Sequence, residues 1–176
     1  MKPTQNNFAY VDGANLHHGV IHLGWQLDYA KFRVWLKEKY GVSRAYLFIG
    51  LVPKNKDLYT NLQEAGFTLV YKEITYDGVG KIKGNCDADL VLKATRDAYE
   101  KESGRMVLVS SDGDYAGLVK FLLERNRFIG IVSPPISAKC SVLLKRTGAR
   151  IAYINDQRSI LEVKKDGHNE KTPDRD

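Results

Sequence analysis

The sequence predicts an α/β fold in which helices cover both faces of a mainly parallel β-sheet. Two observations lead to this prediction. Short apolar segments of strand length alternate with amphipathic segments of helical period along the chain. The strand-like segments are almost continuously apolar, which is typical of parallel strands that are buried on both faces. Ligands of such sheets bind beyond the carboxyl ends of the strands, where the strand order reverses.

The first half of the chain contains three predicted strands and two predicted helices. Aromatic and β-branched residues predict strands at 8–13, 44–52 and 67–73. Apolar residues at helical spacing predict helices at 29–41 and 56–66, and each of these segments ends in glycine, a common C-terminal cap.

The second half follows a loop at 74–85 that contains glycine and lysine. The alternation then predicts, in order, a helix at 86–103, a strand at 105–111, a helix at 114–126, a strand at 127–134, a helix at 137–148 and a strand at 149–154.

The 176 residues suit a single domain, which we expect at 1–162. Residues 163–176 contain four basic, four acidic and few apolar side chains, so we expect a disordered tail. The net charge of +6 favours a polyanionic partner such as nucleic acid. No apolar run is long enough for a membrane span, and the N-terminus lacks the apolar core of a signal peptide. We therefore expect a cytoplasmic protein that does not bind a membrane.

Acidic residues follow two of the predicted strands at their carboxyl ends. Asp12 ends the first strand and Asp112 follows the fourth, so their carboxylates converge if these strands are neighbours. Asp114 lies in the first turn of the next helix. An aspartate there also stabilises a helix N-terminus, and this purely structural role is left open for Asp114. It is less favoured for Asp12, because no strong helical pattern follows directly.

Helical geometry separates two further aspartates in the helix at 86–103. Asp87 shares a face with the apolar residues Leu90 and Ala94, so its carboxylate is expected to point toward the strand ends. Asp89 lies on the opposite face with Lys93 and Arg96, and its expected role is a solvated ion pair on that helix face. Carboxylates gathered at one place repel one another unless they are protonated or bind a cation. Because only oxygen ligands are involved, Mg²⁺ or Mn²⁺ is the expected ion.

Three motifs in this order are similar to the signatures of the NYN domain, a branch of the PIN-like metal-dependent ribonucleases. They are V-D-G-x-N at 11–15, K-G-x-x-D at 83–87 and V-S-S-D-G-D-Y at 109–115, and they resemble most the LabA-like bacterial group. The resemblance implies a Rossmann-like three-layer αβα sandwich with strand order 3-2-1-4-5. It also implies cleavage of RNA by a water that Mg²⁺ or Mn²⁺ activates.

The resemblance also implies roles for individual residues. The catalytic and metal-binding residues would be Asp12, Asp87, Asp112 and Asp114. Asn15 matches a polar residue that orients the first aspartate. Lys83 belongs to the second motif and is expected to contact substrate phosphate.

Two serines of the third motif, Ser110 and Ser111, are candidates for phosphate contacts, although helix capping is the favoured role. Ser111 and Tyr115 stand where the family often has glycine and phenylalanine, changes for which little effect is expected. Lys93 stands where many members carry a further acidic residue.

Other residues carry weaker signals. His17, His18 and His22 lack the third ligand and the glutamate of a zinc protease motif, so surface or packing roles are favoured. Trp25 could either stack on a base or pack in the core. The two cysteines, Cys86 and Cys140, form no C-x-x-C pair and are expected to be reduced thiols.

The predicted function is that of a metal-dependent endoribonuclease acting on single-stranded RNA, and RNA rather than DNA follows from the resemblance alone. The alternative, favoured by Lys93, is an inactive PIN-like module that binds RNA or protein. A small-molecule phosphatase is a weaker third reading. Whether the chain forms a homodimer is left open.

Overall fold

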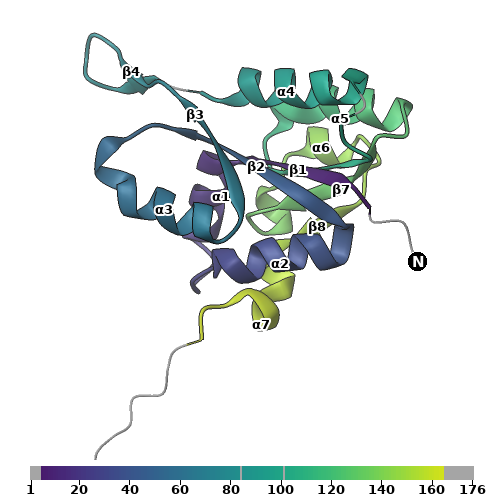
Figure 1. The fold of residues 1–176 in the computed structure, drawn as a ribbon, viewed down its shortest axis with the longest axis horizontal. Helices are drawn as coiled ribbons and strands as arrows, with labels where there is room; N and C mark the ends of the chain where they lie inside the picture. The colour runs from purple at the N-terminus through teal and green to yellow at the C-terminus, as the bar shows by residue number, and fades with distance from the viewer. Residues whose placement is uncertain (1–4, 84, 101, 165–176) are drawn as a thin grey trace, which may run out of the picture.

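The computed structural model describes residues 5–83, 85–100 and 102–164. In this part of the chain, parallel strands form one six-stranded sheet in the order β3-β2-β1-β6-β7-β8 (Figure 1). These strands are β1 (Asn7–Asp12), β2 (Val42–Gly50), β3 (Phe67–Lys72), β6 (Met106–Val109), β7 (Phe128–Ser133) and β8 (Ile151–Tyr153). A separate antiparallel hairpin consists of β4 (Thr75–Tyr76) and β5 (Ile82–Lys83).

Helices cover both faces of the sheet. They are α1 (Gly13–Val20), α2 (Tyr29–Tyr40), α3 (Lys56–Glu64), α4 (Asp87–Glu100), α5 (Ala116–Glu124), α6 (Val142–Lys145) and α7 (Arg158–Leu161). Short 3₁₀ turns are η1 (Pro53–Asn55), η2 (Gly113–Tyr115), η3 (Ser137–Lys139) and η4 (Ile154–Gln157). None of the helices within the described residues is both long enough and apolar enough to cross a bilayer.

The two faces of the sheet form two cores, as the predicted three-layer α/β fold requires. Along β1, Phe8 and Tyr10 point to the core covered by α4, α5 and α6, because alternate side chains point to opposite faces. Ala9 and Val11 point to the core covered by α1, α2 and α7. Figure 1 shows these two groups of helices on opposite sides of the sheet.

The strand order agrees with the predicted 3-2-1-4-5 order for the first five strands of the main sheet. It differs in one respect, because β8 pairs with β7 and adds a sixth strand at that edge. The order reverses between β1 and β6, which lie side by side in the middle of the sheet. The carboxyl ends of these two strands are therefore the place where a ligand site is expected.

Several segments differ from the elements predicted from the sequence. Helix α1 begins directly after β1 and was not predicted, because its two glycines and two histidines leave few apolar residues to show a helical period. The helix expected at 137–148 is instead η3 followed by α6, because Cys140 between them has an extended backbone. The loop at 74–85 contains the β4–β5 hairpin. The tail predicted at 163–176 lies outside the described residues except for its first two.

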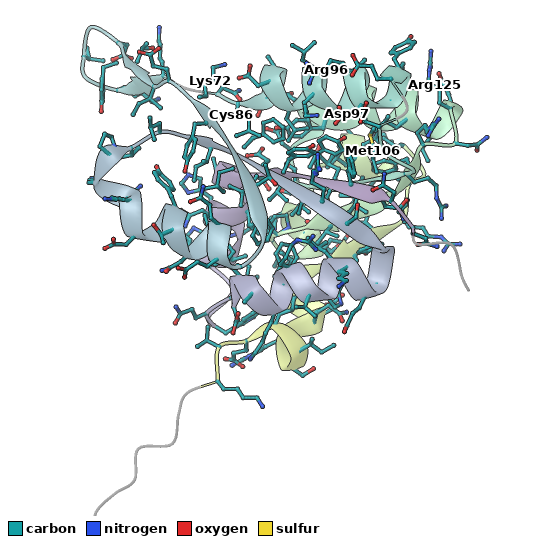
Figure 2. The ribbon with its side chains drawn as sticks, in the orientation of Figure 1. Lys72, Cys86, Arg96, Asp97, Met106 and Arg125 are labelled. Atoms are coloured by element: carbon teal, nitrogen blue, oxygen red, sulfur yellow. The ribbon has the colours of Figure 1, made fainter. Side chains whose placement is uncertain are left out.

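The charges on α4 pair differently from the sequence-based expectation. Figure 2 shows Asp97 on α4. Its carboxylate is fully buried and accepts hydrogen bonds from the Tyr10 hydroxyl at 2.7 Å and from Lys93 Nζ at 2.7 Å. Asp89 does form a solvent-accessible ion pair, but its partner is Lys72 Nζ of β3 at 3.0 Å and not a basic residue of its own helix face. The long aliphatic stem of Lys93 lets its ammonium group reach the buried carboxylate of Asp97 on the next turn of α4.

Candidate functional site

The carboxyl end of β1 leads directly into a helix. Asp12 is the last residue of β1 and the N-cap of α1, and its Oδ1 accepts a hydrogen bond from the Asn15 backbone N–H at 3.1 Å. The next residue must be small, because a Cβ atom on Gly13 would lie 2.6 Å from the Phe48 carbonyl oxygen of β2. The V-D-G-x-N motif therefore lets α1 start in close contact with the neighbouring strand. Capping by Asp12, which the sequence did not favour, is present.

Two further acids, Asp112 and Asp114, follow the carboxyl end of β6. Asp112 is the N-cap of η2 and accepts a hydrogen bond from the Asp114 backbone N–H at 3.0 Å. Asp87 begins α4, and its Oδ2 accepts a hydrogen bond from the Asn85 side chain at 2.8 Å. The apolar face of α4 packs on the sheet, as the helical period of that segment predicts, with Leu90 fully buried.

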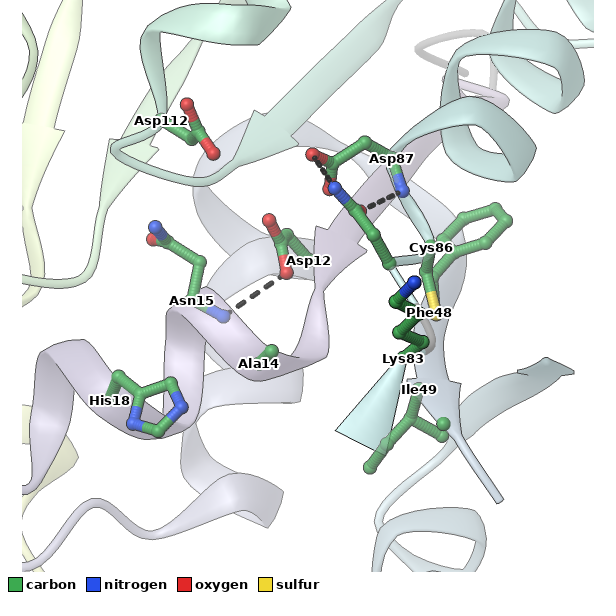
Figure 3. A pocket seen from close by; sticks show the side chains of 12 residues that line it. Asp12, Ala14, Asn15, His18, Phe48, Ile49, Lys83, Cys86, Asp87 and Asp112 are labelled. Carbon is green, nitrogen blue, oxygen red and sulfur yellow. Dashed lines mark hydrogen bonds between the residues drawn. The ribbon is translucent and has the colours of Figure 1, made fainter. Parts of the chain in front are cut away.

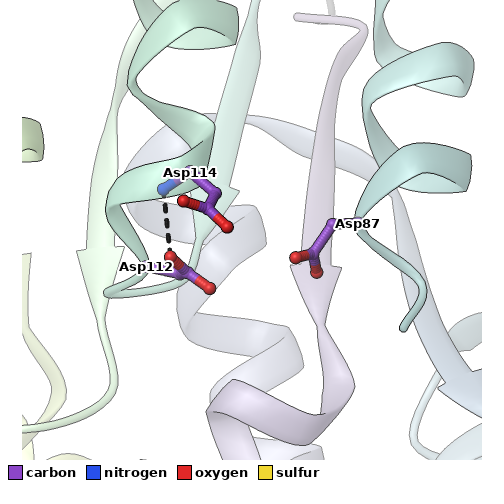
Figure 4. A group of neighbouring side chains, drawn as sticks. All are labelled: Asp87, Asp112 and Asp114. Carbon is purple, nitrogen blue, oxygen red and sulfur yellow. Dashed lines mark hydrogen bonds between the residues drawn. The ribbon is translucent and has the colours of Figure 1, made fainter. Parts of the chain in front are cut away.

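Three of the predicted acids converge. Asp87, Asp112 and Asp114 each offer one carboxylate oxygen, and these oxygens all lie within 4.8 Å of one another (Figure 4). Asp12 is not in this acidic triad, but it lines the same cavity as Asp87 and Asp112 (Figure 3). The cavity has a volume of about 810 Å³, and Lys83 lines it too.

The Tyr115 hydroxyl links two of the four acids. It lies 2.7 Å from Asp87 Oδ1 and 3.1 Å from Asp12 Oδ2, and the side chain is only 1% exposed. Burial raises the pKa of Tyr115 far above its usual value, and the neighbouring carboxylates raise it further. The phenol therefore stays a hydrogen-bond donor to the carboxylates. A phenylalanine would lack this donor, and the expectation that tyrosine in its place has little effect stays a prediction.

The Asn15 side chain acts on a different partner from the one expected. Its Oδ1 accepts hydrogen bonds from the Ser111 backbone N–H at 2.9 Å and from the Ser111 hydroxyl at 3.1 Å. Asn15 reaches Asp12 only through its backbone N–H, and its side chain ties α1 to the loop after β6. Ser111 is thus more than a neutral replacement of glycine.

Ser110 holds the same loop from inside. It is fully buried, and its Oγ accepts a hydrogen bond from the Asp112 backbone N–H at 3.2 Å. Its hydroxyl also lies 3.5 Å from Asp12 Oδ2. These contacts stabilise the loop, but the N-cap of η2 is Asp112, so the capping role favoured for Ser110 belongs to its neighbour. A phosphate contact by Ser110 stays a prediction.

The electrostatics of the cavity favour a cation. Burial is the main cause that raises the pKa of Asp12, and the charges of Asp87 and Asp112 raise it further. The hydrogen bonds from the Asn15 backbone and the Tyr115 hydroxyl oppose this rise. A bound cation would relieve the same repulsion and would favour the charged form of every carboxylate.

The remaining candidates lie outside the acidic triad. Trp25 is 9% exposed and donates to Asn155 Oδ1 at 3.0 Å, so it is a core residue. His18 lines the cavity without belonging to the triad. The His17 and His18 rings lie 5.6 Å apart.

Comparison with known proteins identifies a domain family and agrees with the fold. The family model of the NYN domain matches residues 9–147, a range that contains all four acids. The chain is similar to a Vibrio parahaemolyticus protein of unknown function with a crystal structure, at a TM-score of 0.72 and 23% identity. That similarity covers 89% of this chain and 97% of the other, and it shows the fold alone. No curated protein matches the chain.

Proposed function

Because the chain belongs to the NYN domain family, we propose that it is a divalent-metal-dependent endoribonuclease that cleaves single-stranded RNA. The observation that carries this proposal is the acidic triad at the carboxyl ends of the two central strands. The three quoted motifs favour the LabA-like group within the family.

The donor set of the triad suits Mg²⁺ or Mn²⁺. The ligand atoms of Asp87, Asp112 and Asp114 are all oxygens within 4.8 Å of one another. Two oxygens bound to one ion at about 2.1 Å lie at most about 4.2 Å apart, so small side-chain movements would bring all three onto one ion. Among the described residues no histidine or cysteine joins them, so the chemistry favours a hard cation over zinc. When bound, such an ion supplies an activated water and offsets negative charge on the phosphodiester.

The chain's own residues prepare the site for this chemistry. Tyr115 fixes the relative positions of Asp12 and Asp87, and Asn85 holds the other oxygen of Asp87. Asn15 and Ser111 hold the loop that carries Asp112. Preorganised ligands of this kind lose little freedom when the ion binds.

Substrate recognition rests on charge. Lys83 lines the same cavity as the acids and is the proposed contact for the phosphodiester backbone. The net charge of +6 favours approach of an RNA chain to the protein as a whole.

The alternative is a module of the same fold that binds RNA without cleaving it. Lys93 favours this alternative, because the helix has a lysine where many members of the family carry an acid. Its ammonium group pairs with the buried Asp97 and serves the packing of α4 rather than the cavity. The alternative predicts RNA binding without metal-dependent cleavage.

Labelled single-stranded RNA incubated with the protein in Mn²⁺, Mg²⁺ or EDTA tests the proposal. The key variant is Asp112→Asn, because an asparagine oxygen can still cap η2 and preserve folding. We expect metal-dependent cleavage by the wild type and none by this variant. Asp89→Asn is the matched control, since it makes the same change two residues after Asp87 but outside the triad.

Metal binding provides a readout independent of cleavage. A cation at 100 times its dissociation constant stabilises a protein by about 2.7 kcal/mol. For a domain of this size that raises Tm by about 5–11 °C. We expect this rise for the wild type and for Asp89→Asn but not for Asp112→Asn. RNA binding without cleavage or metal stabilisation in any of the three proteins would favour the alternative.

A further inference from the structure

A second cavity adjoins the acidic one on the α1 side of the sheet. It has a volume of about 570 Å³ and lies between α1 and α3, at the carboxyl end of β2. Ala14, His18, Ile49 and Gly50 line both cavities, so the two adjoin along these residues. Figure 3 shows Ala14, His18 and Ile49 on the side of the acidic cavity away from Asp112. A chain whose phosphate lies at the acids can therefore extend into this second cavity.

The wall of the second cavity is mostly apolar and has a fixed aromatic ring. Leu58 and Leu62 of α3 and Ile74 contribute aliphatic side chains. The Tyr59 ring is held in place because its hydroxyl accepts from the Val52 N–H at 2.9 Å and donates to the Gly50 carbonyl at 3.1 Å. A rigid aromatic ring beside aliphatic side chains is the kind of wall against which a flat heterocycle packs with little loss of entropy.

Two polar groups in the wall are free to bind a ligand. Tyr29 and the Asn55 side chain both line the cavity, and neither makes a side-chain hydrogen bond to another residue of the described chain. An apolar pocket with a few convergent polar groups is typical of small-molecule sites, whose volumes are about 300–1,000 Å³. The hydroxyl and the amide can together offer donors and an acceptor to the edge of a heterocycle.

The lining favours a mainly apolar occupant over a phosphate. No lysine, arginine, aspartate or glutamate is among the described residues that line this cavity, and its two histidines, His17 and His18, are both on the α1 side. Charged groups are instead concentrated in the adjoining cavity, with its aspartates and Lys83. The division suits a nucleotide, with the phosphate at the acids and the base on the apolar side.

We propose that the second cavity binds one unstacked nucleobase of the substrate, next to the phosphodiester that lies at the acidic triad. The proposal rests on the proposed nuclease function for the identity of the ligand. It makes the cavity a determinant of cut-site preference, since Tyr29 and Asn55 face the edge of the base.

Nucleotide titrations monitored by methyl NMR in Mg²⁺ test the proposal without requiring cleavage, because a nucleoside monophosphate has no phosphodiester to cut. The probes are uridine 3′-monophosphate and adenosine 3′-monophosphate, with ribose 5-phosphate as the probe that lacks a base. We expect both nucleotides to shift the methyl signals of Leu58, Leu62 and Ile74, and ribose 5-phosphate to leave them unchanged. Equal shifts from all three probes, or shifts confined to other methyl groups, would overturn the proposal.

Leu58→Glu is the matching variant. Leu58 is 37% exposed near the start of α3, where an acidic side chain is compatible with the helix N-terminus, so folding is expected to survive. The control Leu92→Glu makes the same change at a 67% exposed leucine that lines neither cavity. Only Leu58→Glu is expected to abolish the nucleotide shifts, and it should keep the Mn²⁺ stabilisation of the wild type.

Abasic substrates separate failure of this proposal from failure of the nuclease assignment. A single abasic position next to the cut site is expected to weaken RNA binding about 5- to 150-fold, the range for loss of one stacked base. If the protein cleaves RNA but no abasic position weakens binding and no methyl signal shifts, the protein is a nuclease without a base pocket. Methyl shifts without cleavage would leave the pocket in the RNA-binding alternative.

Discussion

Replacement of Tyr115 by phenylalanine removes one oxygen atom and tests whether this hydroxyl organises the acidic site. The ring is 1% exposed, so phenylalanine fills the same space and the packing is retained. What is lost is the donor shared by Asp87 Oδ1 at 2.7 Å and Asp12 Oδ2 at 3.1 Å. A hydrogen bond to a charged group contributes about 1.5–3 kcal/mol. For a domain of this size that corresponds to a fall in Tm of about 3–12 °C in EDTA.

The same change should weaken metal binding, because loss of a group that orients ligands typically costs about 10- to 100-fold in affinity. Thermal unfolding followed by circular dichroism in EDTA, and then in a Mn²⁺ series, measures both effects. Tyr153→Phe is the control, since Tyr153 is a partly buried tyrosine of β8 whose hydroxyl makes no hydrogen bond within the described chain. A Tyr115→Phe protein with the Tm and the Mn²⁺ affinity of the control would refute the reasoning.

Three further predictions concern folding. Burial raises the pKa of Tyr40 to about 12, above its value of about 10 in the unfolded chain. As the pH rises, the unfolded state therefore loses this proton first, and Tyr40 should lower the free energy of unfolding by up to about 1.4 kcal/mol per pH unit between those two values. Urea titrations at pH 9–12 measure this fall, which should be smaller for Tyr40→Phe. Gly13→Ala should lower the urea midpoint markedly, because its Cβ would lie 2.6 Å from the Phe48 carbonyl oxygen, and an unchanged midpoint would contradict this contact. Lys93→Met should cost about 3–5 kcal/mol in urea unfolding by leaving the fully buried Asp97 without its ion pair, whereas a cost under about 1 kcal/mol would show that the Tyr10 hydroxyl suffices.

The sequence predicted the parts of the site that local periodicity determines. Apolar runs located the ends of β1 and β6, and therefore Asp12 and Asp112. The helical period of α4 distinguished Asp87 from Asp89, because one face of the helix is buried and the other is not. The family resemblance supplied the strand order that brings these elements together.

Contacts between distant segments could not be predicted in the same way. The Tyr115 hydroxyl reaches two acids that are 28 and 103 residues away in the chain, and no local pattern records such a meeting. The Asn15 side chain likewise meets Ser111 across 96 residues. The ion pairs of α4 also depend on contacts between distant segments, because Asp89 pairs with Lys72 of β3 and not with Lys93 one turn away on its own helix.

The two strand-end aspartates cap the helical turns that they begin, and this has an evolutionary consequence. Asparagine caps a helix as well as aspartate does, and a single base change in the codon converts one into the other. A lineage can therefore lose the charge at Asp112 while the protein still folds and accumulates normally. Asp12 differs, because its second oxygen accepts a hydrogen bond from the Tyr115 hydroxyl, and the amide nitrogen of an asparagine could not accept it. Folding exerts little selection for the charge at Asp112, so its retention in any descendant would reflect selection on the chemistry, and catalytically silent relatives should arise readily beside active ones.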